Sequence, residues 1–298
     1  MNRADRKRRA LRTGLQGTSP VVAVGAHDAM TACLIERHGF DAVWVSGLGV
    51  ATMTHAIPDL NLVTMTEALA AARRADAATS LPVIADCDNG FGSLSNVVRT
   101  VREYERAGIA AICVEDNAFP KRNSLYAGDT QRDLVSPREQ AARIRAAKMT
   151  QETNDFLFIA RIESLIAGTG VEDACLRADA YVDAGADAIL IHSRDKTLSD
   201  IERFLDRWEG RDAIPLVSVP TLYPSFTVEE LGSRGFRMVI FANHPMRAAV
   251  TAIEQTLETL GRERRASAVD PEIAPVDHIF ELVGTKDAIQ LEDSSEDG

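Results

Sequence analysis

Short apolar runs recur along the whole 298-residue chain, and longer polar stretches separate them. Eight runs are continuously apolar, as expected for strands that are covered on both faces. They are Val21–Val24, Ala42–Val45, Pro82–Ala85, Ala111–Val114, Phe156–Ala160, Ala188–Ile191, Leu216–Val219 and Met238–Phe241. Between them, stretches rich in Ala, Arg, Glu and Leu predict helices at Met65–Ala78, Ser95–Ala107, Pro137–Lys148, Val171–Ala184 and Val228–Ser233. Strict alternation of strand and helix implies a parallel sheet.

Four of the strands follow a glycine that ends the preceding helical stretch. These glycines are Gly39, Gly108, Gly185 and Gly235. Glycine supplies the left-handed backbone conformation with which many helices end. Eight such units fit a closed (β/α)8 barrel of the TIM type better than an open doubly wound sheet, because no GxGxxG turn follows an early strand. The sequence therefore predicts an α/β fold, a (β/α)8 barrel with an N-terminal helix and a C-terminal helical arm.

The two ends of the chain differ in character from the repeating units. The basic segment Arg3–Arg12 is interpreted as the polar face of a first amphipathic helix. The segments Met246–Leu260 and Val276–Val283 carry more apolar residues than a free tail should, so they predict a docked C-terminal arm or helices that close this chain's own barrel. We expect one barrel domain with its arm over residues 1–290, followed by an acidic, disordered tail at 291–298.

Composition narrows the class of protein. A hydrophobic content of 45% and a charged content of 26% are ordinary for a globular enzyme. The net charge of −11 argues against nucleic-acid binding, because phosphates would be repelled. No apolar run is long enough to span a bilayer, and the N-terminus lacks the apolar core of a signal peptide. A cytoplasmic enzyme without nucleic-acid or membrane partners is expected.

Polar residues follow almost every predicted strand, which is where active sites of such barrels lie. In chain order they are His27 and Asp28, Trp44 to Leu48 and then Asp59, Asp86 and Asp88, Glu115 and Asp116, the loop Phe119–Ser124, Arg161 and Glu163, His192 and Ser193, Thr221, and Asn243 with His244. Each has a structural alternative: Glu163 and Asp116, for example, are suitable ion-pair partners for Arg161 or Lys121. The collective pattern nevertheless predicts one polar site at the strand ends.

Four of these residues are carboxylates that can converge from neighbouring strand ends: Asp59, Asp86, Asp88 and Glu115. Asp86 and Asp88 would point to the same side if the strand continues through both. Because buried carboxylates repel one another, a hard divalent cation is expected between them, Mg²⁺ or alternatively Mn²⁺. Alone, the Asp86–Asp88 pair is equally consistent with exposed loop acids.

Candidate anion-binding residues are expected opposite the acids. They are Arg161 and His192, joined by Lys121 from a loop. A metal held by acids and faced by cations suits a small, highly anionic ligand.

Four segments carry a resemblance to a known family: Asp86–Gly92, Glu115–Ser124, Ala160–Glu163 and Ile191–Ser193. They resemble the isocitrate lyase/phosphoenolpyruvate mutase superfamily, and within it most closely the phosphoenolpyruvate mutases. The likeness runs from the first strand to Phe241–His244 and the helix beyond, so it covers nearly the whole chain.

The resemblance implies a role for each site residue. Asp86 would ligate Mg²⁺ directly, and Asp59, Asp88 and Glu115 would hold it mainly through waters. The carboxylate and enolate end of the substrate would be bound by Trp44, Ser46 and the backbone N–H groups of Gly47 and Leu48. The phosphoryl group would be bound by Arg161, His192 and Asn123, with Lys121 and Asn123 on a gating loop. The implied catalytic residues are Asp59, Lys121, Asn123, Arg161 and His192.

The implied reaction interconverts phosphoenolpyruvate and phosphonopyruvate by moving a phosphoryl group within one molecule, the step that forms the P–C bond in phosphonate biosynthesis. A phosphonopyruvate hydrolase is the nearer alternative. The resemblance implies Thr in hydrolases at the position of Asn123, so Asn123 favours the mutase. Lyases that act on oxaloacetate or 2-hydroxydiacids are a further alternative, although the loop at Phe119–Ser124 lacks the cysteine of the isocitrate lyases. A non-catalytic binding barrel is disfavoured because Asp86, Glu115 and Arg161 are present. Relatives are oligomers, so a homotetramer or homodimer with exchanged C-terminal helices is expected.

Overall fold

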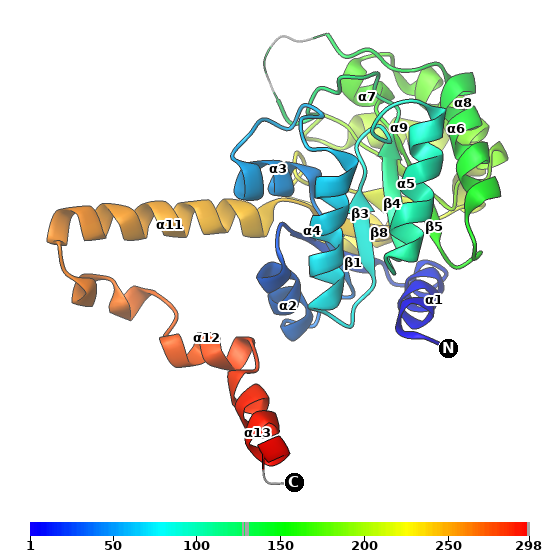
Figure 1. Ribbon diagram of the computed structural model, residues 1–298. Helices are drawn as coiled ribbons and strands as arrows, with labels where there is room; N and C mark the ends of the chain where they lie inside the picture. Colours follow the sequence, from blue (N-terminus) through cyan, green and yellow to red (C-terminus); the bar gives the residue numbers. More distant parts are fainter. Residues whose placement is uncertain (127, 129–130, 297–298) are drawn as a thin grey trace. The chain divides into compact units, whose positions relative to one another are not determined.

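The computed structural model describes residues 1–126, 128 and 131–296. Eight parallel strands close into a barrel in the order β1 to β8, with β8 pairing with β1 (Figure 1). The strands are β1 (Val21–Ala26), β2 (Ala42–Val45), β3 (Val83–Asp86), β4 (Ala111–Glu115), β5 (Leu157–Ile162), β6 (Ala188–Ile191), β7 (Leu216–Ser218) and β8 (Phe236–Phe241). All eight predicted strands are confirmed, with ends shifted by at most two residues, and so is the (β/α)8 fold.

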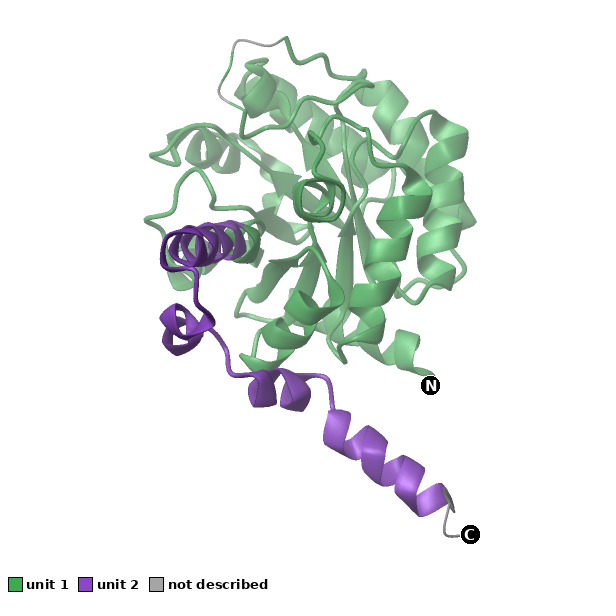
Figure 2. Cartoon of the chain, turned by 60° about the vertical axis from the view of Figure 1, so that its left-hand side comes forward, with its two compact units in different colours: residues 1–246 green, residues 247–298 purple. Residues whose placement is uncertain are grey.

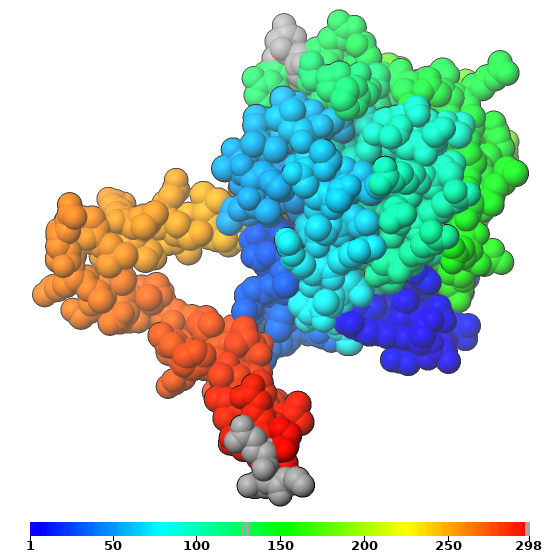
Figure 3. All heavy atoms as spheres, viewed as in Figure 1, coloured from blue at the N-terminus to red at the C-terminus, as the bar shows by residue number. Residues whose placement is uncertain are grey.

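Within residues 1–246, helices cover the barrel on the face seen in the space-filling view (Figure 3). The chain continues into further helices beyond this unit, and the described residues contain thirteen α-helices in all. They are α1 (Arg3–Leu15), α2 (Ala29–Arg37), α3 (Gly47–His55), α4 (Met65–Ala77), α5 (Leu94–Arg106), α6 (Pro137–Thr150), α7 (Ser164–Ala167), α8 (Val171–Asp183), α9 (Ser199–Arg207), α10 (Val228–Ser233), α11 (His244–Glu263), α12 (Val276–Leu282) and α13 (Thr285–Glu296). The five helices predicted between strands are confirmed as α4, α5, α6, α8 and α10.

Two apolar clusters hold the barrel together. One lies between the sheet and its helices and includes Tyr104, Tyr181 and Phe204. The other fills the inside of the barrel with residues such as Trp44 and Leu190. All four predicted turn glycines have φ between +75° and +99°, the left-handed conformation that links each helix to the next strand.

Helix α1 closes the end of the barrel where the strands begin (Figure 1). Leu11 and Leu15 pack into the interior cluster. Contrary to the interpretation of Arg3–Arg12 as a simple polar face, Lys7 and Arg8 are buried. Arg8 donates to the carbonyl oxygens of Glu105 and Ile109, which lie just before β4. Long basic side chains can bury their stems while their charged ends reach backbone carbonyls.

The chain divides into two compact units, residues 1–246 and 247–298 (Figure 2). This division does not coincide with the predicted boundary at residue 290. Residues 291–296 belong to α13, whereas the sequence predicted a disordered tail over 291–298. Residues 297–298 lie outside the described residues. None of the helices among the described residues is long and apolar enough to cross a membrane.

Candidate active site

A pocket of about 50 Å³ opens where the barrel strands end. Ten of the twelve predicted site residues line it: Trp44, Ser46, Leu48, Asp59, Asp86, Glu115, Lys121, Asn123, Arg161 and His192. The other two, Gly47 and Asp88, line a smaller pocket that shares Asp59 and Asp86 with the first. The predicted residues are therefore brought together, and Val219, Thr221, Ala242 and Asn243 complete the far wall.

Asp86 and Asp88 approach each other, but not because they lie on the same face of one strand, as the sequence suggested. Strand β3 ends at Asp86, and Asp88 lies beyond it with φ +49°, in the left-handed region. A Cβ atom added at Gly47 would lie 3.2 Å from Asp86 Oδ2 and 3.2 Å from Asp88 Oδ1. Both carboxylates thus point toward the start of α3, and glycine at position 47 leaves room for them. Cys87, which separates the two aspartates in the sequence, is fully buried in the apolar cluster between the sheet and its helices.

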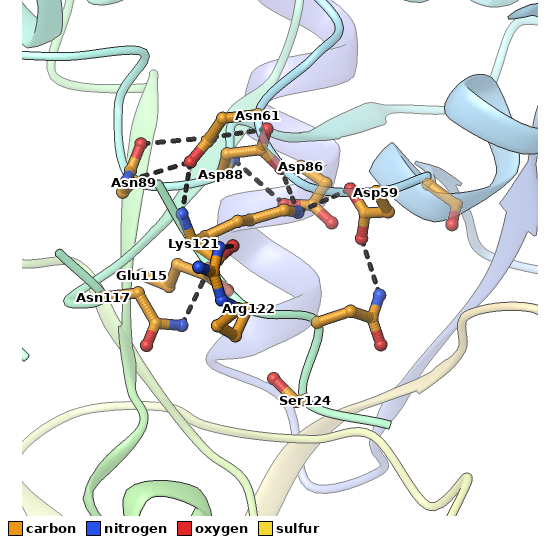
Figure 4. A network of polar contacts seen from close by, with 12 residues as sticks. Asp59, Asn61, Asp86, Asp88, Asn89, Glu115, Asn117, Lys121, Arg122 and Ser124 are labelled. Atoms are coloured by element: carbon orange, nitrogen blue, oxygen red, sulfur yellow. Dashed lines mark hydrogen bonds and ion pairs between the residues drawn. The ribbon is translucent and has the colours of Figure 1, made fainter. Parts of the chain in front are cut away.

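Lys121 lies among the acids rather than opposite them, which corrects the expected separation of acids and cations (Figure 4). Its Nζ atom is 2.8 Å from Asp59 Oδ1 and also bonds to Asp88. Burial alone would lower the pKa of Lys121, but the surrounding carboxylates, Asp88 and Asp59 first, raise it well above its usual value. Lys121 is therefore a cation that joins the loop Phe119–Ser124, which we call the gating loop after its expected role, to the acidic wall.

Asn61 is a residue that the sequence reasoning missed (Figure 4). Its Oδ1 accepts the backbone N–H of Lys121 at 2.6 Å, and its Nδ2 donates to Asp88 Oδ2 at 3.1 Å. It thereby fixes the gating loop and an acid together. Asn61 follows no strand, since it lies in the connection between α3 and α4. The only sequence signal for a functional role of Asn61 is its position two residues after Asp59 in a polar loop.

Asn123 fastens the gating loop at a second point. Its Nδ2 donates to Asp59 Oδ2 at 2.6 Å, and its Oδ1 accepts the backbone N–H of Leu125 at 2.9 Å. Asp59 therefore binds both loop residues that the sequence had singled out, Lys121 and Asn123. Lys121, Asn123 and Ser124 of this loop line the pocket.

Arg161 is held by three polar groups. Its Nε donates to Glu163 Oε1 at 2.6 Å, its Nη2 donates to Ser124 Oγ at 2.7 Å, and its Nη1 lies 3.5 Å from Glu115 Oε2. Ser124, also missed as a functional residue, in turn donates to Glu163 Oε2 at 2.7 Å. The guanidinium is thus fixed in orientation by Glu115 of β4, by Glu163, which follows β5, and by Ser124 of the gating loop.

Asp116 supports this arrangement from behind. Its Oδ1 accepts the backbone N–H of Glu163 at 2.9 Å, and its Oδ2 accepts from Tyr181 Oη at 2.7 Å and Arg177 Nη1 at 3.0 Å. Glu163 therefore pairs with Arg161, as its structural alternative allowed, whereas Asp116 pairs with Arg177 and not with Lys121. Burial raises the pKa of Asp116 to about 6.

His192 is not part of a cationic cluster. It is 2% exposed, and burial together with the nearby Arg161 charge lowers its pKa from 6.5 to about 3. At neutral pH it is therefore an uncharged imidazole. Its Nδ1 atom is buried and has no hydrogen-bond partner within the described part of the chain. A neutral ring of this kind can donate one hydrogen bond to an anion in the pocket.

The start of α3 offers backbone donors to the same pocket. Ser46 precedes the helix and its Oγ accepts the N–H of Gly49 at 3.1 Å. The N–H groups of Gly47 and Leu48, in the first turn, have no partner earlier in the helix. Unpaired N–H groups and the helix dipole make a helix start suitable for a carboxylate or enolate oxygen.

The acidic wall has donor chemistry that fits a hard divalent cation. Burial raises the pKa values of Asp86, Asp88 and Glu115. With Asp59 and Glu163, five carboxylates face two cations, Lys121 and Arg161, and carboxylate oxygens are the ligands that Mg²⁺ prefers. As the described side chains stand, however, no three acidic, histidine or cysteine residues are gathered closely enough to hold an ion together. The fit therefore rests on donor type and on excess negative charge.

Comparisons with known proteins decide between the families that such a barrel could belong to. The model of the phosphoenolpyruvate phosphomutase family matches residues 11–260. The chain belongs to this family. It is therefore an enzyme of the phosphomutase family, as the resemblance in the site segments indicated.

Individual phosphomutase relatives are similar over nearly their whole length. The phosphoenolpyruvate phosphomutase of Tetrahymena pyriformis is 37% identical over 287 residues, 96% of this chain and 94% of that protein. The crystal structure of the phosphoenolpyruvate phosphomutase from Streptomyces platensis subsp. rosaceus is 42% identical, with a TM-score of 0.92 over 96% of this chain and 98% of that chain. A phosphonopyruvate hydrolase, solved in complex with oxalate and Mg²⁺, is 40% identical with a TM-score of 0.89 over 96% and 98%. Overall similarity alone does not separate the two activities.

Proposed function

We propose that the protein is a phosphoenolpyruvate mutase, which interconverts phosphoenolpyruvate and phosphonopyruvate by moving the phosphoryl group between oxygen and carbon. The observation that carries this proposal is Asn123. Asn123 lies in the gating loop at the position where phosphonopyruvate hydrolases are expected to carry Thr. Its Nδ2 atom donates to Asp59 Oδ2 at 2.6 Å. A loop fastened in this way supports the exclusion of water, which separates a mutase from a hydrolase.

The two ends of the substrate find different partners. The N–H groups of Gly47 and Leu48 and the side chain of Ser46 would bind the carboxylate and enolate oxygens at the start of α3. Arg161 and His192 would bind the phosphoryl oxygens, one as a fixed cation and the other as a neutral donor. Trp44, 2% exposed, forms an apolar part of the pocket wall.

A divalent cation, Mg²⁺ or Mn²⁺, would be held by Asp86 directly and by Asp59, Asp88 and Glu115. When bound, such an ion would stabilise the negative charge of an enolate oxygen. Lys121, which now lies between Asp59 and Asp88, would remain a cation beside the acids.

The chain's own groups suit a loose phosphoryl-transfer transition state. In such a transition state the phosphoryl group is weakly bonded to both the leaving and the attacking atom, so catalysis depends on orientation and charge stabilisation. Glu163, Ser124 and Glu115 fix the orientation of Arg161 before substrate arrives. The gating loop, fastened through Lys121 and Asn123 to Asp59, would keep out the water that would turn the phosphoryl group into phosphate.

Phosphonopyruvate hydrolase remains the second candidate, because a hydrolase shares 40% of the sequence and the same fold. It differs in product and not in substrate. A carbon–carbon lyase is less consistent with the site, since the gating loop contains no cysteine to act as an acid.

We also propose that the protein is a homotetramer or a homodimer in which C-terminal helices are exchanged. Within the second unit, Ile253, Leu257 and Phe280 are each at least half exposed. Burial of such side chains against another copy would remove apolar surface from water. Light scattering coupled to gel filtration would give the mass in solution, and a monomer at micromolar concentration would contradict this proposal.

The function is tested by phosphorus NMR of the purified protein with Mg²⁺ and phosphonopyruvate. We expect phosphoenolpyruvate to appear, and the Asp59→Ala and Asn123→Ala variants to form none. Inorganic phosphate with pyruvate would identify a hydrolase instead. No change in the phosphorus spectrum would contradict both and direct the search to oxaloacetate and 2-hydroxydiacids.

A further inference from the structure

Asn243 lies in the pocket wall opposite the acids, and the proposed mutase reaction assigns it neither substrate nor metal binding. It follows β8, is 4% exposed and lines the pocket together with Thr221 from the end of β7. His192, from the end of β6, lines the pocket on the same side. Three neighbouring strands thus end in uncharged polar side chains, whereas β3 to β5 end in charged ones.

The side chain of Asn243 does not perform the structural task that its position suggests. It immediately precedes α11, where Asn usually caps a helix by accepting a backbone N–H from the first turn. Its Oδ1 atom is instead buried and accepts no hydrogen bond within residues 1–126, 128 and 131–296. Its Nδ2 atom makes one long bond, 3.4 Å, to Thr221 Oγ1. A buried acceptor left without a partner costs free energy, so a compensating function is expected.

The backbone also brings Asn243 inward. A Cβ atom added at Gly25 of β1 would lie 2.0 Å from the carbonyl oxygen of Ala242. Only glycine at position 25 therefore allows the end of β8 to approach β1 so closely. Ala242 and Asn243 line the pocket as a result.

The phosphoryl group is the part of the substrate that lacks donors. The carboxylate and enolate end has Ser46 and the N–H groups of Gly47 and Leu48. The guanidinium of Arg161, by contrast, is already engaged with Glu163, Ser124 and Glu115. Asn123, also expected to bind this group, already donates from Nδ2 to Asp59. Three phosphoryl oxygens accept more hydrogen bonds than the remaining N–H groups of Arg161, of Asn123 and of one neutral His192 can supply.

We propose that Asn243 is a substrate-binding residue for the phosphoryl end. A half-turn of its carboxamide directs Nδ2 into the pocket, where it donates to a phosphoryl oxygen. The same turn places Oδ1 toward Thr221, whose hydroxyl then donates to it, so both polar atoms gain partners. This inference rests on the function proposed above, because it assumes a ligand with a phosphoryl or phosphonyl group.

Replacement of Asn243 by Asp separates this role from a structural one. Asp has nearly the same size and can accept the hydroxyl hydrogen of Thr221 in place of the long bond that Asn243 now donates, so a purely structural role predicts little loss. A role in binding the phosphoryl group predicts repulsion, because a carboxylate would face an anion. The KM for phosphonopyruvate and the inhibition constant of oxalate, which has no phosphoryl group, are measured with Mg²⁺, together with the melting temperature. Asn154→Asp, at an exposed position, is the control for the added charge.

For Asn243→Asp we expect the KM for phosphonopyruvate to rise about tenfold or more, a loss of about 1.4 kcal/mol of binding. The inhibition constant of oxalate and the melting temperature should change little. Asn243→Ala and Thr221→Val should raise the KM by smaller factors, and they keep the test decisive if the Asp variant does not fold. A wild-type KM in all three variants, or an equal loss for oxalate, would overturn the inference.

The wild-type control distinguishes failure of the inference from failure of the proposed function. If the wild type forms inorganic phosphate, the mutase proposal fails while the KM comparison still decides the role of Asn243, since a hydrolase must also bind the phosphoryl group. If the wild type does not consume phosphonopyruvate, both proposals are overturned.

Discussion

The two ends of the barrel both bury charged side chains, but they differ in how those side chains are partnered. Where the strands begin, each buried basic group of α1 has its own acceptor: Lys7 pairs with Asp76 at 2.6 Å, and Arg8 binds two backbone carbonyls. Where the strands end, buried acids lie beside one another, and burial raises the pKa values of Asp86 and Asp88.

We infer from this difference that the end where the strands begin serves stability and that the end where they finish serves the proposed chemistry. A buried basic group whose hydrogen bonds are satisfied is compatible with a stable fold, and removing it leaves its buried acceptors without a donor. A buried group of like charges costs free energy and persists where function requires it. Substitutions at the first end should therefore lower stability without altering catalysis. Substitutions at the second end should do the reverse.

The largest effect is expected for Asp86→Asn. The change removes one carboxylate from the proposed cation site, so kcat/KM should fall about 10³-fold or more, in the range lost when a key electrostatic group is removed. The melting temperature should stay the same or rise, because an uncharged amide replaces a buried acid whose pKa burial has raised. Asp206→Ala, at an exposed position, is the control. A clear drop in melting temperature with retained activity would contradict the division between the two ends.

The second effect concerns the gating loop. Asn123→Thr removes the bond from Nδ2 to Asp59 and leaves a hydroxyl in its place. Formation of phosphoenolpyruvate should fall about 10²-fold, as for the loss of one positioned donor, and the share of inorganic phosphate among the products should rise. Both products are quantified by phosphorus NMR. A variant that keeps the wild-type product ratio would remove Asn123 as the basis for the mutase proposal.

At the other end, Arg8→Ala should reduce stability alone. The change deprives the buried carbonyl of Ile109 of its donor and removes the packing of the guanidinium 6.0 Å from the centre of the Phe156 ring. The free energy of unfolding should fall by about 2 kcal/mol. Denaturant titration measures it, and Arg9→Ala, on the same helix but with a side chain 63% exposed, is the matched control. An equal loss in both variants, or a changed KM, would argue against this assignment.

The last prediction is that the ring of His192 does not titrate near neutral pH. Because burial and the Arg161 charge lower the pKa of His192 to about 3, its ring should not titrate between pH 5 and 8 in NMR. Above pH 6.5 the ring is neutral in both the folded and the unfolded chain, so the lowered pKa does not change the stability. As pH falls from 6.5 toward 3, the unfolded chain takes up the proton first, and the free energy of unfolding decreases. His192→Asn should remove that part of the acid sensitivity. Titration near pH 6.5 would show that the ring is not buried as described.

The strand pattern predicted the barrel because both faces of each strand are buried, which leaves a simple apolar signature. It also placed the acids and Arg161 at the strand ends, since position in a barrel follows from order in the chain. The strand pattern did not predict that Lys121 lies between Asp59 and Asp88. The path of a loop depends on tertiary contacts, such as the hydrogen bond from the backbone N–H of Lys121 to Asn61 Oδ1.

The charge state of His192 and the buried face of α1 were inaccessible for a related reason. Burial reverses the usual expectation that His titrates near pH 6.5 and that Lys7 and Arg8 face water. Such effects depend on which atoms surround a group in three dimensions, and sequence spacing does not contain that information.

The most direct test of the account follows phosphonopyruvate in ¹⁸O-labelled water with Mg²⁺. Transfer within one molecule in a pocket closed to water predicts phosphoenolpyruvate whose phosphoryl oxygens carry no ¹⁸O, observed as an unshifted phosphorus resonance. Inorganic phosphate that contains ¹⁸O would show that water captures the phosphoryl group, and it would contradict the proposed mutase activity.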